Sequence, residues 1–328
     1  MTTQLLRFYD RVKRWTDDTA ATVWDDTRLR LLAIVGSIAM VALAPVIFTS
    51  TLIRLFIEVA IYGIFALSLN LLIGYTGLLS FGHAAFFGTP AYVALLMMTN
   101  GITSVWLILP VAILATLVLA LVMGYLSLQS YGIYFAMLTL AFSQVVYVLA
   151  QNQPFGLTGG SNGLISLEYP NFGIPGVVHL ELSTVEYFYI AVVLLVAVYY
   201  VVRRVVNSPF GSVLIAIREN EDRVAFAGYN VLFYKLASFS LSAVLCAFGG
   251  LLFAFYYRAV SPEHLYWLWS GEGVAMVILG GAGSVVGPIF GAIAFIGIRE
   301  AVSPFLTDWT IVLGIVFVGT ILVRALRE

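Results

Sequence analysis

Residues 104–128 read SVWLILPVAILATLVLALVMGYLSL, a run without a single charged side chain. A helix needs roughly 20 mostly apolar residues to cross the hydrocarbon core of a bilayer, so this run is long enough to span a membrane. The stretch from Leu31 to Val202 contains only these charged side chains: Arg54, Glu58, Glu168, Glu181 and Glu186. Apolar residues make up 61% of the chain and the mean hydropathy is +1.00, which excludes a soluble domain and predicts a polytopic membrane protein.

The number and type of the spans follow from reading the rest of the chain in windows of the same length. Backbone groups in lipid must be hydrogen-bonded within their own segment or in a closed barrel, and the alternation of barrel strands is absent, so we expect helices. The predicted spans are 31–48, 52–73, 83–98, 104–128, 132–151, 184–202, 232–257, 266–281, 284–299 and 308–323. The predicted fold class is an all-α polytopic membrane protein of about ten transmembrane helices with glycine-rich helix breaks.

Basic residues predict the orientation of the chain. Thirteen of them fall in the N-terminal tail, in the break at 203–235 and after the last span, whereas Arg54, Arg258 and Arg299 fall at the other side. The positive-inside rule therefore places both termini and that break in the cytoplasm. This orientation requires an even number of spans, which is the main reason to divide residues 263–301 into two helices.

The predicted organisation is one membrane domain flanked by short tails. Residues 1–30 are polar and do not resemble a cleavable signal peptide, so we expect a cytoplasmic N-terminal tail, and 324–328 form a cytoplasmic C-terminal tail. The membrane domain covers 31–323. It carries two long polar interruptions, an external loop at 152–183 and a cytoplasmic loop at 203–231.

A glycine-rich motif, GYTGLLSFGHAAFFG, interrupts the apolar sequence at 74–88. Glycines and hydroxyls between apolar helices describe backbone that bends and exposes amides and carbonyls. At membrane depth such backbone is buried in protein or lines a water-filled path. The helix ends near Gly77 and Gly82 are therefore candidates to frame a translocation path. The alternative is close contact between helices through small residues, and composition does not decide between the two.

A second break, GGAGSVVGP, lies at 280–288. Pro288 suits the first turn of a new helix, with Ser284 as its cap. Both breaks place small residues at the start of a following helix, which hints at an internal duplication.

Polar side chains inside the predicted spans are costly in lipid, so they are expected to face protein or water. Glu58 either lines a path or pairs with Arg54 one turn away. His83 follows the first break, where a hydrogen-bonded structural histidine is the expected role. The candidate translocation-path residues are Glu58, Asn70, Thr76, Gly77, Ser80, Gly82, His83, Ser143, Gln144, Glu272, Gly280, Gly281, Gly283 and Ser284.

The external loop is rich in turn-forming residues and contains no Lys or Arg. It is a candidate to close or line the outer mouth of a path, and the alternative is an ordinary ordered loop. The candidate residues on this surface are Thr158, Gly159, Gly160, Ser161 and Asn162.

The cytoplasmic loop predicts two short helices. Ser208 and Pro209 suit the start of the first, and Asn220 suits the cap of the second, which Gly228 is placed to end. Their charged surface is a candidate docking site for a cytoplasmic partner, and the alternative is a solvated interhelical loop. The candidate residues of this surface are Arg218, Glu219, Asn220, Glu221, Asp222, Arg223 and Gly228.

The sequence offers no constellation for catalysis or metal binding. Cys246 is the single cysteine and the three histidines have no ligand spacing, so no metal site is predicted. No nucleophile–base pair or carboxylate dyad appears, so we do not expect an enzyme. Neither Lys13 nor Lys235 follows a glycine in a Gly-Lys-Ser/Thr motif, so the chain has no phosphate-binding loop for ATP.

Motifs in one order along the chain carry a family resemblance. They lie at 70–88, 132–142, 157–164, 216–221 and 277–288. As a set they resemble the LivM-type branched-chain amino acid ABC transporter permeases of the LivH/LivM family. The chain departs from the family at 129–131, where Gln-Ser-Tyr stands in place of a basic residue. This departure weakens the prediction of family-type contacts at that cytoplasmic turn.

The resemblance implies a path-forming subunit in a bacterial or archaeal cytoplasmic (inner) membrane that imports leucine, isoleucine and valine. Its implied partners are a second, LivH-type permease, two cytoplasmic ABC ATPases and a periplasmic or extracellular solute-binding protein. No cofactor is expected in this chain, because ATP and magnesium would be bound by the ATPases. The segment 216–228 would contact an ATPase, and no nucleic acid is expected.

Three alternatives stay open at this point. Urea or short-chain amide permeases have closely similar motifs. A secondary transporter, independent of an ATPase, would use acidic residues in the membrane for ion coupling, and Glu58 and Glu272 are the available pair. A membrane enzyme is the remaining class, and no catalytic constellation favours it.

Overall fold

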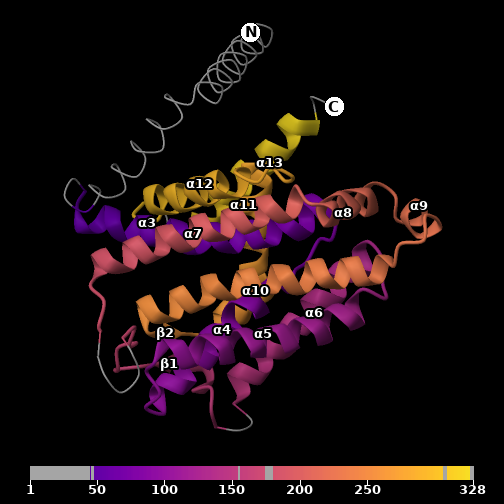
Figure 1. Cartoon of the computed structure of the whole chain (residues 1–328). Helices are drawn as coiled ribbons and strands as arrows, with labels where there is room; N and C mark the ends of the chain where they lie inside the picture. Colours follow the sequence, from indigo (N-terminus) through magenta and orange to yellow (C-terminus); the bar gives the residue numbers. More distant parts are fainter. Residues whose placement is uncertain (1–44, 46–47, 154–155, 174–179, 306–308, 326–328) are drawn as a thin grey trace, which may run out of the picture. The chain divides into compact units, whose positions relative to one another are not determined.

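The computed structural model describes residues 45, 48–153, 156–173, 180–305 and 309–325 (Figure 1). The chain divides into two units, Met1–Ile53 and Arg54–Glu328. In the first unit, the described residues are Pro45 and 48–53, where α3 begins. The predicted tail at 1–30 and nearly all of the predicted span at 31–48 lie outside the described residues.

Helices form most of the described chain. The α-helices are α3 (Ser50–Asn70), α4 (His83–Thr99), α5 (Val105–Ser127), α6 (Ile133–Asn152), α7 (Thr184–Val206), α8 (Pro209–Glu219), α9 (Glu221–Phe226), α10 (Val231–Tyr257), α11 (Trp267–Gly280), α12 (Gly287–Val302) and α13 (Trp309–Ala325). The shorter elements are a π-helix η1 (Leu71–Thr76), the 3₁₀ turns η2 (Gly160–Asn162) and η3 (Pro262–Leu265), and strands β1 (Leu164–Ile165) and β2 (Ala259–Val260).

The helix positions agree with the predicted spans from 52–73 onward to within a few residues. The division of 263–301 into two helices is confirmed, because α11 and α12 are separate. The connection between them contains Gly281 at φ 102° and Gly283 at φ 85°. These left-handed conformations are open to glycine and end the α-helical path of the chain.

Five helical segments of the described chain are long and apolar enough to cross a membrane: Ser50–Thr76, Val105–Ser127, Ile133–Asn152, Thr184–Val206 and Val231–Tyr257. The apolar helices His83–Thr99 and Trp267–Gly280 are shorter, as is typical of helices interrupted at membrane depth. The total of ten spans and the cytoplasmic position of the termini stay predictions.

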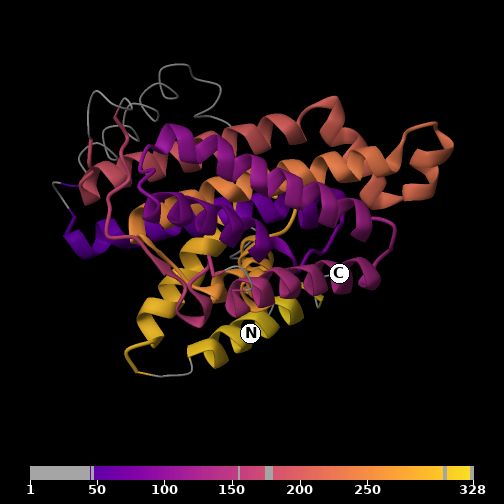
Figure 2. The same ribbon diagram turned by 90° about the horizontal axis from the view of Figure 1, so that it is seen from below.

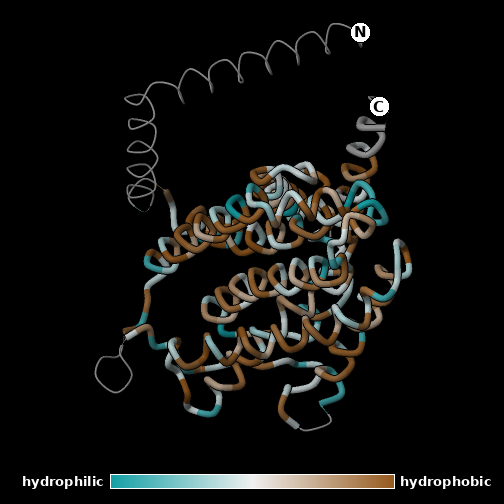
Figure 3. Tube along the Cα trace, turned by 45° about the vertical axis from the view of Figure 1, so that its right-hand side comes forward, coloured by the Kyte–Doolittle hydropathy of each residue, from teal (hydrophilic) through white to brown (hydrophobic). Residues whose placement is uncertain are grey.

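The apolar helices differ in how much of their surface other helices cover. Most side chains of α10 are buried, and this helix packs against α4, α5, α7 and α8. By contrast, α5, α6 and α7 expose large apolar side chains such as Leu114, Ile133 and Val193. Figure 3 shows that the helices are mainly hydrophobic, and that hydrophilic residues gather near their ends. The exposed faces therefore require lipid or an apolar partner.

The two ends of the helices carry different structures. At one end, β1 pairs antiparallel with β2, with Leu164 opposite Val260 and Ile165 opposite Ala259, so the segment after α6 is fixed to the segment after α10. At the other end lie α8 and α9, which project beyond neighbouring helices in both Figure 1 and Figure 2. The membrane helices thus separate the β1–β2 end from the α8–α9 end.

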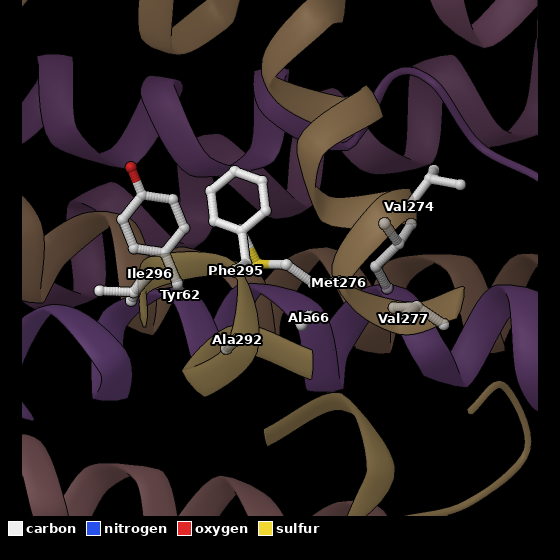
Figure 4. Close-up of a cluster of buried hydrophobic side chains, with 9 residues drawn as sticks. Tyr62, Ala66, Val274, Met276, Val277, Ala292, Phe295 and Ile296 are labelled. Atoms are coloured by element: carbon white, nitrogen blue, oxygen red, sulfur yellow. The ribbon is translucent and has the colours of Figure 1, made fainter. Parts of the chain in front are cut away.

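A buried apolar cluster joins α3, α11 and α12 (Figure 4). The members labelled there are Tyr62, Ala66, Val274, Met276, Val277, Ala292, Phe295 and Ile296, and Leu69 also belongs to the cluster. Glycines bring α11 and α12 into backbone contact beside it. A Cβ at Gly280 would collide with the carbonyl group of Gly287, and a Cβ at Gly291 would collide with the carbonyl oxygen of Met276. This is the close approach that small residues permit between membrane helices.

Candidate functional site

The first glycine-rich break is built around the π-helical turn η1, which continues α3 and ends at Gly77. Single π-helical turns are frequent at functional sites. The amide of Leu78 donates to the carbonyl of Leu72 (2.9 Å), and the Thr76 hydroxyl donates to the carbonyl of Leu71 (2.9 Å). Gly77 has φ 75°, the left-handed conformation that glycine adopts at helix ends. The break is therefore an ordered turn with its own hydrogen bonds.

Asn70 joins this break to the second one. Its side chain is fully buried at the end of α3. Its Nδ2 donates to the carbonyl of Ser284 (2.9 Å), and its Oδ1 accepts from the amide of Gly283 (3.1 Å). A Cβ at Gly74 would collide with Asn70 Oδ1 and with the amide nitrogen of Gly283. The two breaks are thus in direct contact, and we call Asn70, Gly74, Gly77, Gly283 and Ser284 the glycine junction.

Arg218 connects the glycine junction to the α8–α9 end. This residue lies in the last turn of α8. Its Nη1 donates to the carbonyl oxygen of Gly74. A Cβ at Gly77 would lie only 2.7 Å from Arg218 Cγ, so glycine there leaves room for the arginine stem. Three segments far apart in the sequence therefore meet at one place.

The remaining candidates near the first break are also held by protein contacts. Ser80 Oγ accepts from the amide of Gly82 (3.3 Å), and a Cβ at Gly82 would lie 2.7 Å from the carbonyl oxygen of Thr139. His83 is fully buried, and its Nε2 lies 2.9 Å from the hydroxyl oxygen of Ser68. Because Ser68 is on α3, this hydrogen bond crosses the break, as expected for a structural histidine.

The other polar candidates lie in different places. Ser143 on α6 donates to the carbonyl of Leu265 in η3 (2.8 Å). Gln144 is its neighbour, and its Oε1 is buried without a hydrogen-bond partner in the described chain. Ser284 Oγ accepts from the amide of Gly287 (3.1 Å), the first residue of α12, although the N-cap position itself is Val286. Thr76 also contacts the Ser238 hydroxyl of α10 (2.8 Å).

These placements favour the role of the small residues in close helix contact. The glycines of both breaks lie against backbone or side chains of neighbouring elements, and Asn70, Ser80 and His83 are fully buried. Whether any of them lines a translocation path stays a prediction.

Glu58 does not pair as one of the sequence alternatives predicts. It forms an ion pair of 2.6 Å with Arg299 of α12 rather than with Arg54. Both side chains are mostly buried, at 16% and 19% exposed, so each charge compensates the other in an apolar setting. Glu272 is on α11, is partly buried, and interacts electrostatically with the same arginine. The pairing of α3 with α12 was not visible in the sequence, because the two residues are far apart in the chain.

The α8–α9 pair forms as the capping residues predict. Ser208 Oγ accepts from the amide of Gly211 (3.3 Å) at the start of α8, and Asn220 Oδ1 accepts from the amide of Arg223 (2.9 Å) at the start of α9. Gly228 follows the end of α9 with φ 89°. A cavity of about 940 Å³ lies between the two helices, and Ser212 and Ala216 of α8 are among its lining residues.

Two charged residues of this pair bond to the membrane helices. Arg218 is bonded to Gly74, and Glu221 forms an ion pair with Lys235 of α10, whose side chain is 8% exposed. Of the predicted residues of this surface, Glu221 is half-buried and the others are exposed: Arg218, Glu219, Asn220, Asp222, Arg223 and Gly228. The ion pair of Lys235 was missed, because the sequence shows only a basic residue near the start of a predicted span and does not indicate its partner.

Phe226 is a surface residue that sequence reasoning also missed. Its side chain is 91% exposed at the end of α9. The signal was present, because Val224 is the buried residue of α9 and a position two residues later lies about 200° around the helix. An exposed aromatic ring beside charged residues is typical of a protein interface.

The external segment lies over the β1–β2 end. Thr158 donates to the carbonyl of Ala150 (2.6 Å), Gly159 and Gly160 have positive φ, and Ser161 and Asn162 are exposed. Beneath them is an apolar pocket of about 270 Å³ between α4 and α6. The hydroxyls of Thr89 and Tyr92, which line it, have no hydrogen-bond partner in the described chain. The surface of this pocket is almost wholly apolar, so it suits an aliphatic group.

Together, the apolar helices, their glycine-rich breaks and the projecting α8–α9 pair define a polytopic helical membrane protein. The family described as branched-chain amino acid transport system / permease component matches residues 51–323, and the chain belongs to it. The chain is thus a member of a family of transport permeases.

Individual relatives agree with this family. The chain is 31% identical over 264 residues to the high-affinity branched-chain amino acid transport system permease protein LivM of Salmonella typhimurium and to that of Escherichia coli, covering 75% of this chain. It spans 62% of the length of each of those relatives. A probable LivM of Methanocaldococcus jannaschii is 24% identical over 291 residues, which cover 78% of this chain and 83% of the relative. No solved structure matches the chain significantly.

Proposed function

We propose that this chain is a transmembrane permease subunit of an ATP-driven ABC importer for branched-chain amino acids. The observation that carries the proposal is the 31% identity to two LivM proteins over 75% of the chain. The matched family region, 51–323, includes both glycine-rich breaks and the α8–α9 pair. The proposed substrates are leucine, isoleucine and valine.

The proposed complex contains a second, LivH-type permease, two cytoplasmic ABC ATPases and an external solute-binding protein. The ATPases bind ATP and magnesium and supply the energy, since this chain has no Gly-Lys-Ser/Thr motif. The exposed apolar faces of α5, α6 and α7 provide surface for lipid and for the second permease. The complex resides in a bacterial or archaeal cytoplasmic membrane.

The proposed coupling uses the α8–α9 pair as the cytoplasmic docking element. Its exposed residues include Glu219, Asp222, Arg223 and Phe226, which combine charges with an aromatic anchor. Closure of the ATPases displaces this pair and shifts the helices around a central path, which gives alternating access. The binding protein docks on the opposite side, including the external loop at 152–183, and carries most of the substrate specificity.

Uptake by proteoliposomes tests this function. The chain is reconstituted with its neighbouring permease, ATPases and binding protein, and radiolabelled leucine and urea are compared. Leucine uptake that requires ATP and the ATPases is the expected result. Uptake of urea instead would assign the chain to the urea or amide permeases of the same family. Uptake that persists without the ATPases would contradict the ABC mechanism and favour a secondary transporter.

A further inference from the structure

Arg218 holds the end of a membrane helix against α8. Its guanidinium donates to the carbonyl of Gly74 in η1, the turn that ends the long helical segment begun by α3. Carbonyls in the last turn of a helix lack partners within that helix and carry its partial negative charge. A guanidinium at this place satisfies such an acceptor and compensates its charge. The contact therefore has the form of a helix cap, made by a residue of α8.

The first break makes room for this arginine, and the second lies beside it. A Cβ at Gly77 would press on the Arg218 stem, and one at Gly283 would lie 3.6 Å from Arg218 Nη1. Gly283 in turn donates its amide to Asn70. The guanidinium thus lies beside the connection between α11 and α12 as well as against η1.

We propose that Arg218 is a positioning residue that transmits displacement of α8 to both glycine-rich breaks, and through them to α3, α11 and α12. This inference rests on the proposed coupling of the α8–α9 pair to ATPases. A displacement of α8 acts on Gly74 through Arg218, and it reaches Gly283 and Ser284 through the two hydrogen bonds of Asn70. Helix α9 has a separate attachment, because its Glu221 is held by α10.

The exposed charges of the same pair have a different role. Glu219, Asp222 and Arg223 are exposed at the surface, where a partner can reach them. Arg218 is also exposed, but its guanidinium donates to the carbonyl of Gly74 in η1. Loss of an exposed charge is therefore expected to weaken assembly with the ATPases. Loss of Arg218 is expected to leave assembly intact and to separate ATP hydrolysis from transport.

The first experiment compares Arg218→Gln and Arg218→Lys with the matched control Arg223→Gln in the complete reconstituted complex. Arg218→Gln is expected to retain ATPase binding and hydrolysis and to lower leucine uptake per ATP about tenfold or more, the factor expected when a charge-assisted hydrogen bond is lost. Arg218→Lys keeps the charge and is expected to restore part of the leucine uptake per ATP. Arg223→Gln is expected to weaken binding of the ATPases and to keep the wild-type uptake per ATP in the complexes that form. The proposal would be overturned if Arg218→Gln kept the wild-type leucine uptake per ATP, or if this variant failed to bind the ATPases.

The second experiment needs no transport and separates this proposal from the proposed function. Hydrogen exchange of the full chain in detergent is expected to increase at η1 and at 281–286 in Arg218→Gln, and to stay unchanged there in Arg223→Gln. Unchanged exchange at both breaks in Arg218→Gln overturns the link even where transport is ATP-driven. Transport by the wild-type chain when the ATPases are omitted would overturn the proposed function. The hydrogen-exchange result would still decide whether Arg218 links α8 to the two glycine-rich breaks.

Discussion

Replacing Gly291 by alanine tests the backbone contact between α11 and α12. A Cβ at Gly291 would collide with the carbonyl oxygen of Met276 and would lie 3.0 Å from the amide nitrogen of Gly280. Both atoms belong to helix backbone, so the strain is relieved only when α12 moves away from α11. Overpacking of this kind costs about 1–3 kcal/mol.

Gly297 provides the matched control in the same helix, because a Cβ there would meet nothing within 4 Å. Alanine stabilises a helix interior over glycine by about 0.5–1 kcal/mol at either position. This gain cancels when the two variants are compared. Gly291→Ala is therefore expected to be about 1–3 kcal/mol less stable than Gly297→Ala.

The assay is thermal unfolding of the purified full chain in detergent micelles. For a chain of this length, 1 kcal/mol corresponds to about 2 °C in Tm, so Gly291→Ala is expected to unfold about 2–6 °C below Gly297→Ala. The reasoning would be refuted by equal Tm values for the two variants, since the side chain added at Gly291 would then have met no resistance from α11.

Three further predictions concern polar and aromatic contacts. Glu58→Gln and Arg299→Gln are each expected to lower the Tm, and the double variant is expected to lose less than their sum. Arg299→Gln leaves the mostly buried carboxylate of Glu58 without its partner, whereas Glu58→Gln leaves Arg299 with the longer contact to Glu300 (3.4 Å). Additive losses in this double-mutant cycle would argue against the ion pair. Glu221→Gln is expected to increase hydrogen exchange of the α9 amides more than Lys235→Met does. The reason is that Glu221→Gln leaves the ammonium of Lys235, whose side chain is 8% exposed, without its carboxylate. The reverse order would contradict the ion pair between Glu221 and Lys235. Phe226→Ala is expected to leave the Tm unchanged, because the ring is 91% exposed. The same variant is expected to bind the ATPase about fivefold more weakly or worse. Unchanged binding would show that the ring is not part of the interface with the ATPase.

The structure divides the α8–α9 pair into inward and outward contacts. Arg218 and Glu221 join it to η1 and α10, while Asp222, Arg223 and Phe226 stay at its surface. An element built in this way is held firmly by the membrane helices and still presents a free surface. This is the arrangement that transmission of a force from a docked partner requires.

The sequence by itself determined the membrane class, the positions of the helices from α3 to α13 and the division between α11 and α12. It also determined the caps at Ser208 and Asn220, which accept the backbone hydrogen bonds expected of them. These features are local, because an apolar run, a capping side chain or a glycine in a left-handed conformation acts within a few residues.

Only the tertiary structure decided which of these local features meet. Asn70 and Ser284 are separated by 214 positions, and Arg218 and Gly74 by 144, yet each pair forms a hydrogen bond. Glu58 had a neighbour of opposite charge one turn away in sequence, and it pairs instead with Arg299. Sequence spacing sets which residues share a helix face, whereas the approach of one helix to another depends on how all their surfaces fit together.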